Sequence, residues 1–247
     1  MVCMNTLQPV LIDSWNISTE GNRKFGSIIA YLTSLLTIIT LALALTALPN
    51  SGSNCIENCV NFAYTEITSE FPGDYFWMVV AIFMILSYLF LMTILHRFTP
   101  QSKKIYSNIA MNLALVVSVI ILMNYYMQLR IIQASLVLGE TAGIPLLTQY
   151  NPNGVFISLE ELGFLLMSFS FFFSGLTFSG GSKLERGLRI ITIAAFVISL
   201  IAYIAMFALY GTDIEDRYEI IVISVNWLLL IAFGIMTGKF ISKLDID

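Results

Sequence analysis

The sequence predicts an all-α polytopic membrane protein, a bundle of six transmembrane helices with the N-terminus and the C-terminus both cytoplasmic. Composition is the first observation, because 57% of the 247 residues are hydrophobic and 11% are charged, about half the charge of an ordinary soluble domain. The second is that apolar stretches long enough to cross a bilayer recur six times. The third is that the connections between these stretches alternate in charge.

Each apolar stretch is predicted to be a helix because it is long and continuously apolar, whereas a membrane strand would be shorter and would alternate polar with apolar residues. The predicted spans cover residues 25–48, 75–98, 106–129, 156–178, 188–210 and 218–240. They form a single predicted transmembrane domain over residues 25–243. A cytoplasmic or interfacial leader precedes it over residues 1–24, and a short C-terminal tail follows over residues 244–247.

The charged residues of the connections set the predicted orientation, because lysine and arginine favour the cytoplasmic side of a membrane. Basic residues gather before the first span and after the second, fourth and sixth spans, as Arg23, Lys24, Arg97, Lys103, Lys104, Lys183, Arg186, Arg189, Lys239 and Lys243. The other connections are mainly acidic and contain Glu57, Glu66, Glu70, Asp74, Glu140, Asp213, Glu215 and Asp216, beside Arg217. The lipid bilayer is therefore the expected partner, and the acidic connections are expected outside.

A polar cluster, NYYMQLR at residues 124–130, interrupts the outer end of the third span. Asn124 and Gln128 share one face of the predicted helix, and Tyr126, Arg130 and Gln133 share another. A lipid-facing asparagine is costly even near the surface. We therefore expect Asn124 to bond a neighbouring helix or to line a water-filled cleft.

The start of the fourth span, SLEELGF at residues 158–164, is the expected partner of this cluster. Ser158 and Glu161 have the spacing of a capping box, which is one interpretation of Glu161. Glu160 cannot occupy the same cap position, so it needs a partner or a proton. Arg130 and the two glutamates are predicted at dipole-favoured helix ends on one side of the membrane. We therefore expect an ion pair between Arg130 and Glu160 or Glu161.

The sharpest site hypothesis is an outward-facing polar cleft that binds a ligand. Its predicted lining residues are Asn124, Gln128, Arg130, Glu160, Glu161, Tyr203 and Asn226. In the competing interpretation, the same side chains form scattered hydrogen bonds between helices, and Asn226 only joins two helices.

The connection after the third span is long and mostly uncharged. Gly139 is expected to end a helix, and residues 151–154 have the chemistry of a turn. The connection either lies on the membrane or covers the cleft as a lid. With the start of the fourth span it reads GETAGIPLLTQYNPNGVFISLEELGFLLMS, which resembles uncharacterised six-span membrane proteins of bacteria and archaea. We expect a multi-pass protein of a prokaryotic cell membrane, and the resemblance implies no function.

Several functional classes are excluded by the residues that the sequence contains. The single histidine, His96, rules out bis-histidine haem ligation and the H-E-x-x-H metalloprotease pattern. No Walker A loop and no G-x-G-x-x-G motif occurs, so nucleotide binding has no support. The net charge of −4 comes from few ionised groups, without a block of like charge, so nucleic acid is not an expected partner. We predict no cofactor and no metal site.

Cys55 and Cys59 lie in the first outer connection as C-I-E-N-C. A disulfide between them requires a turn, because a helix would strain the bond at this spacing. Free thiols are the alternative, and a redox function lacks the usual C-x-x-C spacing.

The sequence is compatible with three functions. The first is binding or transport of an anionic or zwitterionic small molecule or lipid headgroup, held by Arg130 and balanced by the acids. The second is a structural or assembly role, in which the same residues lock helices together. The third, an intramembrane enzyme that uses Glu160 or Glu161 as acid or base, lacks an accompanying nucleophile, metal or cofactor motif.

Overall fold

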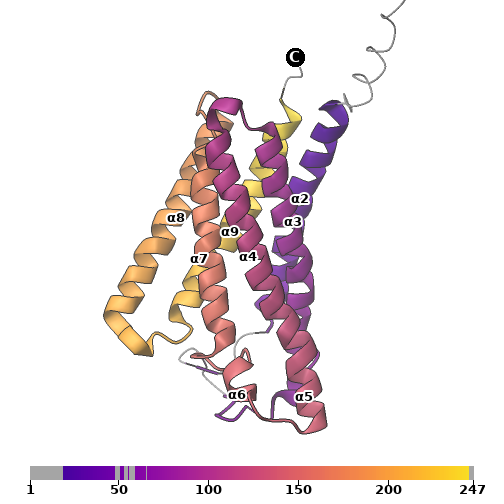
Figure 1. The fold of residues 1–247 in the computed structure, drawn as a ribbon, viewed down its shortest axis with the longest axis vertical. Helices are drawn as coiled ribbons and strands as arrows, with labels where there is room; N and C mark the ends of the chain where they lie inside the picture. The colour runs from indigo at the N-terminus through magenta and orange to yellow at the C-terminus, as the bar shows by residue number, and fades with distance from the viewer. Residues whose placement is uncertain (1–18, 48–50, 53–54, 56–58, 65, 245–247) are drawn as a thin grey trace, which may run out of the picture.

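The computed structural model describes residues 19–47, 51–52, 55, 59–64 and 66–244. Over these residues the chain is helical and contains no strand, which confirms the all-α prediction. Six helices are long and apolar enough to cross a membrane, as predicted. They are α2 (Thr19–Ala44), α3 (Phe76–Phe98), α4 (Lys104–Met127), α7 (Val155–Gly175), α8 (Lys183–Tyr210) and α9 (Arg217–Ser242) (Figure 1).

Shorter elements join the long helices. A π-helical turn, η4 (Gln128–Ile132), and then α5 (Gln133–Leu138) continue directly from α4. The linker, which we define as residues 139–154, contains the single turn α6 (Ile144–Leu147). The remaining short elements are 3-10 turns: η1 (Ile67–Glu70), η2 (Gly73–Tyr75), η3 (Gln101–Lys103) and η5 (Gly211–Asp213).

Six spans bring the two ends of the described chain together at one end of the bundle. Arg23 Nη1 donates a hydrogen bond of 2.9 Å to the carbonyl oxygen of Leu244. We call this the terminal end, where α2 begins and α9 ends, and we call the opposite end, which carries α5 and α6, the linker end (Figure 1). The acidic connections lie at the linker end, away from most lysines and arginines.

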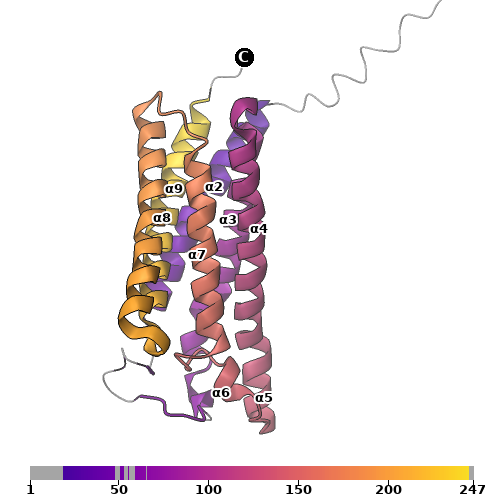
Figure 2. The same cartoon turned by 60° about the vertical axis from the view of Figure 1, so that its left-hand side comes forward.

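The helices pack in a closed order. Neighbouring pairs are α2 with α3, α3 with α4, α4 with α7, α7 with α8, α8 with α9, and α9 with α2. A further contact joins α7 to α9 across the centre. Figure 2 shows α4 and α8 at opposite sides with α7 between them. Helices α7 and α9 are therefore central, and α8 is the most peripheral.

The predicted spans find the apolar middle of each helix but miss polar turns at the ends. Helix α2 begins at Thr19 instead of residue 25, and an ion pair of 2.8 Å between Lys24 and Glu20 supports the added turn. Helix α8 begins at Lys183 instead of residue 188, behind a capping box formed by Ser182 and Glu185. The third span continues to Leu138 instead of residue 129. Hydropathy follows the lipid-facing part of a helix, whereas caps and ion pairs extend it beyond that part.

Small residues allow close contact between α2 and α9. The Ser34 hydroxyl donates to the carbonyl oxygen of Ile231 at 2.9 Å, and the Ser27 hydroxyl donates to that of Gly238 at 3.2 Å. Gly234 faces the backbone of α2 so closely that an added Cβ would lie 2.6 Å from the carbonyl oxygen of Ala30. This is the way helices associate in lipid, where backbone proximity replaces the hydrophobic effect.

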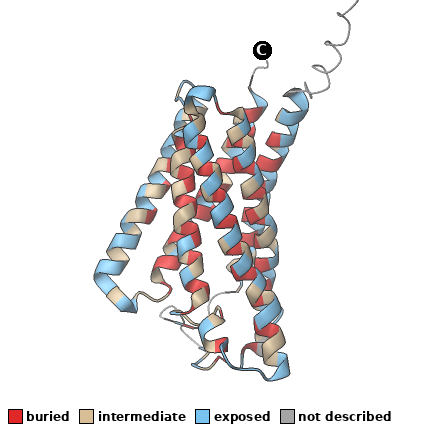
Figure 3. Ribbon diagram, in the orientation of Figure 1, coloured by how far each residue is buried: buried red, intermediate tan, exposed pale blue. Residues whose placement is uncertain are grey.

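The outer surface of the bundle is apolar, as a lipid-facing surface requires. Figure 3 shows exposed residues along the outward sides of the helices and buried residues toward the centre. On α8 the exposed large hydrophobic side chains are Ile190, Val197, Ile198, Ile201, Tyr203, Ile204, Phe207, Leu209 and Tyr210.

Parts of three expectations lie outside the described residues: residues 1–18 of the predicted leader, residues 245–247 of the predicted tail, and Glu57 of the first acidic connection.

The structure joins Cys55 and Cys59 in a disulfide.

We predict that Gly234→Ala destabilises the bundle, because the new methyl group must separate α2 from α9 or displace Ser34. Overpacking of this kind costs ~1–3 kcal/mol, which thermal unfolding of the detergent-purified protein should show as a lower Tm. Gly73→Ala is the matched control, since a Cβ at Gly73 meets nothing within 4 Å. Equal Tm values for the two variants would contradict the close α2 and α9 contact.

Candidate functional site

The polar cluster at the end of the third span faces into the protein along one side. Asn124 Nδ2 donates to the carbonyl oxygen of Phe156 at 2.9 Å, and the Tyr125 hydroxyl donates to Glu160 Oε1 at 2.6 Å. Asn124, Tyr125 and Gln128 are almost completely buried. Asn124 and Tyr125 connect α4 to the first turns of α7.

Gln128 fixes the linker. Its amide nitrogen donates to the carbonyl oxygen of Leu147, and its amide oxygen accepts a hydrogen bond of 3.1 Å from the backbone N–H of Gln149. Both halves of a buried amide group are therefore used. The π-helical turn that begins at Gln128 keeps Ile132 and Gln133 buried as well, while Arg130 and Ile131 are exposed.

The expected ion pair between Arg130 and Glu160 or Glu161 is wrong. Arg130 is exposed, and the ion pairs recorded among the described residues are Lys24 with Glu20 and Arg217 with Glu215.

The antiparallel arrangement of α4 and α7 explains this separation. Asn124 lies level with Phe156. From there, Arg130 is about 9 Å farther toward the linker end, whereas Glu160 is about 6 Å in the opposite direction, at 1.5 Å per residue. A guanidinium at the end of a span also reaches water at little cost, while its burial is expensive.

The predicted capping box at Ser158 and Glu161 is also wrong. Helix α7 begins at Val155, with Gly154 as its N-cap. The Ser158 hydroxyl bonds back to the carbonyl oxygen of Gly154 at 3.0 Å, as a serine inside a helix does. Glu161 thus belongs to the second turn, where its carboxyl group meets the backbone N–H of Glu219 and lies near Asp216.

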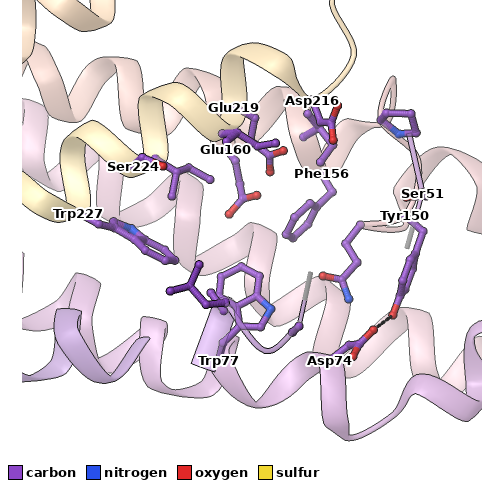
Figure 4. A pocket seen from close by; sticks show the side chains of 18 of the residues that line it. Ser51, Asp74, Trp77, Tyr150, Phe156, Glu160, Asp216, Glu219, Ser224 and Trp227 are labelled. Atoms are coloured by element: carbon purple, nitrogen blue, oxygen red, sulfur yellow. Dashed lines mark hydrogen bonds between the residues drawn. The ribbon is translucent and has the colours of Figure 1, made fainter. Parts of the chain in front are cut away.

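A pocket of about 190 Å³ lies at the linker end, between α2, α3, α7, α9 and the linker (Figure 4). Its carboxyl-bearing lining residues are Asp74, Glu160, Asp216 and Glu219, and its aromatic ones are Trp77, Tyr150, Phe156 and Trp227. We call these eight residues and the space they enclose the acidic pocket. Among the described residues that line it, none is a lysine, an arginine or a histidine.

The N-terminal ends of three helices supply the carboxyl groups. Asp74 lies just before α3, Glu160 lies in the second turn of α7, and Asp216 and Glu219 lie at the start of α9. Positive dipole ends favour acidic side chains in these places. The dipole explains why acids are tolerated there, but it does not explain why they face one another instead of water.

Glu160 and Glu219 form the centre of the pocket. The two residues are 1% and 9% exposed, and their carboxyl groups interact directly. Figure 4 shows the two side chains reaching from neighbouring helices into the same space. Since Tyr125 also donates to Glu160, this cluster joins α4, α7 and α9.

Tyr150 forms the linker side of the pocket. Its hydroxyl donates to Asp74 Oδ2 at 2.8 Å (Figure 4). Burial, more than the nearby Tyr75 and Asp74, raises the pKa of Tyr150 well above its ordinary value. The hydroxyl therefore keeps its proton and remains a donor to the Asp74 carboxylate.

Two other predicted site residues lie away from the pocket. The Asn226 amide nitrogen donates to the carbonyl oxygens of Phe164 and Val222 and to the Ser168 hydroxyl, so Asn226 holds α9 against α7. Tyr203 is on α8 and packs edge-on against Tyr218, with ring centroids 5.2 Å apart. Asn226 thus joins two helices by hydrogen bonds, as the competing interpretation describes.

Of the predicted site residues, only Glu160 lines the acidic pocket; Glu161 lies beside it, and Asn124 and Gln128 support its walls. Sequence reasoning missed Asp74, Trp77, Tyr125, Tyr150, Asp216, Glu219 and Trp227 as site residues. A usable signal was the pair Asp216 and Glu219 at the start of the sixth span, which repeats the acidic opening of the fourth.

Comparisons of the chain with family models, curated proteins and solved structures found no match. The chemistry of the acidic pocket is therefore the basis for assigning a function.

We predict that Gln128→Ala releases the linker, because Leu147 and Gln149 lose their buried partner. The loss of a buried hydrogen-bond partner costs ~1–3 kcal/mol, so amide hydrogen exchange over residues 143–150 should become faster. Arg130→Ala, half a turn away and exposed, should leave exchange unchanged. Faster exchange in both variants would show that the whole end of α4, and not Gln128, controls the linker.

Proposed function

We propose that this chain is an integral membrane protein that binds a small organic cation, such as a protonated amine or a quaternary ammonium, in the acidic pocket. The observation that carries the proposal is the composition of the walls. Four carboxyl side chains and four aromatic side chains face one space, and none of the described lining residues is basic.

Carboxylates and aromatic faces together favour an organic cation. Carboxylates supply charge, while indole and phenol rings attract cations through their negative faces and exclude water. Trp77 and Trp227 have ring centroids 6.2 Å apart, and Trp77 also packs edge-on against Tyr125 at 5.2 Å. The aromatic wall is therefore built from rings that support one another.

Other occupants fit less well. An anion was expected from Arg130, but that side chain is outside the pocket, and anions would meet four carboxyl groups instead. A metal ion is not favoured either, since among the described residues no three Asp, Glu, His or Cys side chains converge as metal ligands.

A purely structural role explains Asn226 and Gln128 better than it explains the acids. Two carboxyl groups in contact hold helices together less well than an acid and a base, or than an apolar pair. Their presence beside an open space therefore supports binding.

The charge asymmetry of the bundle supports an orientation. With lysine and arginine concentrated at the terminal end, the positive-inside rule places that end in the cytoplasm and the acidic pocket on the outer side. We assign the protein on this basis to a cell membrane. We propose, as the sequence analysis expected, that this membrane is prokaryotic.

A second cavity supports transport as an extension of binding. It measures about 600 Å³ and lies at the terminal end, among residues of α3, α8 and α9 and the segment after α7. Along α3, α7 and α9, the buried rings of Tyr88, Phe171 and Phe233 lie between the residues that line the two cavities, with centroids 5.6 Å and 5.2 Å apart for successive pairs. Passage between the cavities would require these rings to part, so transport would need movement of α7 against α3 and α9.

We predict that phenethylammonium raises the Tm of the detergent-purified protein in a concentration-dependent way, because a ligand at 100 times its Kd stabilises the folded state by about 2.7 kcal/mol. Phenylethanol and phenylacetate, which share the ring but not the positive charge, should have little effect. Glu219→Gln should abolish the shift and Trp227→Phe should weaken it.

Glu140→Gln is the matched control, because it removes the same charge from an exposed position. A shift that survives in Glu219→Gln would place the ligand elsewhere. A larger shift with phenylacetate would reverse the proposed charge selectivity.

A further inference from the structure

We propose that Glu160 and Glu219 share one transferable proton and that an organic cation enters the acidic pocket in exchange for it. The inference rests on the proposed cation binding and assigns a coupling ion to the same site. The pocket would then be a proton and cation exchange site instead of a simple receptor site.

The geometry of the pair requires a proton. An ionised carboxylate can only accept hydrogen bonds. Glu160 and Glu219 are both buried, line the same pocket and interact side chain to side chain, and two ionised carboxylates so placed would repel each other, so one of them must hold a proton. Tyr125 does not meet this need, because its own hydroxyl hydrogen is directed at Glu160 Oε1.

No fixed positive charge among the described residues replaces that proton. The titratable groups around the pair are Tyr125 from α4, Glu161 from α7, Asp216 and Tyr218 from α9, Asp74 before α3, and Tyr150 from the linker. The portion of α2 that lines the pocket is apolar. All these groups are neutral or acidic, so they can only oppose a second negative charge on the pair.

Arg217, the nearest basic residue along α9, contacts residues outside the acidic pocket. Arg217 Nη1 donates to the carbonyl oxygen of Asp213 at 2.7 Å and lies 3.4 Å from Glu215 Oε2, and its guanidinium stacks over the ring of Tyr210 at 4.5 Å. An incoming cation is therefore the charge that lets both glutamates ionise.

An independent observation points to a ligand in the acidic pocket. Trp227 lines the acidic pocket and is 3% exposed, yet its indole Nε1 has no hydrogen-bond partner. Buried indole N–H groups ordinarily find an acceptor. A bound molecule, or a carboxylate released from its partner, could supply one.

The exchange balances in atoms and in charge. The O–H bond of the protonated carboxyl group breaks, and its proton leaves to water. The cation then takes its place between two carboxylates. The pair and its occupant carry one net negative charge before and after the exchange, and no electron is transferred.

The test uses phenyltrimethylammonium, which has no N–H and so cannot release a proton itself. The cation is added to full-length protein in weakly buffered detergent solution with a pH-indicator dye, and its binding is measured in parallel by calorimetry. We expect release of about one proton per bound cation, and an affinity that rises about tenfold per pH unit while the pair remains protonated. Phenylethanol should release none.

Variants locate the proton. Glu219→Gln and Glu160→Gln should each abolish proton release, whereas Glu140→Gln should release as much as the wild-type protein. Undiminished release in a folded Glu219→Gln variant would overturn the assignment to this pair. If either buried variant fails to fold, the wild-type pH profile still decides.

Binding that releases no proton and has the same affinity at every pH would overturn the exchange but leave the proposed function intact. Absence of binding at every pH would overturn both.

Discussion

The contact between the Glu160 and Glu219 carboxyl groups constrains the whole linker end of the bundle. Two acids that meet inside an apolar structure need donors, shielding from lipid and close control of distance. Tyr125 supplies a donor from α4, while the direct contact of α7 with α9 sets the distance. Trp77 and Phe156 line the same pocket with apolar surface. The acidic pocket exists because these requirements are met together.

The same end of the molecule also shows how polar side chains replace the hydrophobic effect in lipid. Asn124 binds the first turn of α7, Gln128 binds the linker, and Tyr150 returns from the linker to Asp74. Each bond joins segments that are distant in sequence. The helices are therefore held in register by directional contacts, and the apolar surface remains free to face the membrane.

The sequence was sufficient for the architecture but only partly sufficient for the site. Six apolar stretches of fixed length fix the number of spans, because the bilayer sets that length. Helical spacing also identified Asn124 and Gln128 as members of one face. It could not pair them correctly, since pairing depends on the vertical offset between α4 and α7. Arg130 and Glu160 are both predicted near the same membrane surface, in consecutive spans. In the structure they lie on opposite sides of the level where Asn124 bonds to Phe156. Glu219 was missed because helix order along the chain does not reveal the direct α7 and α9 contact.

The linker has a mechanical role that follows from its three attachments. It leaves α5 at Gly139, is held to η4 by Gln128, and reaches α7 only after placing Gln149 and Tyr150 in the wall of the pocket. A rotation or shift of the linker end of α4 is therefore expected to move that wall. The linker thus couples the position of α4 to the position of the Tyr150 ring, through the hydrogen bonds of Gln128.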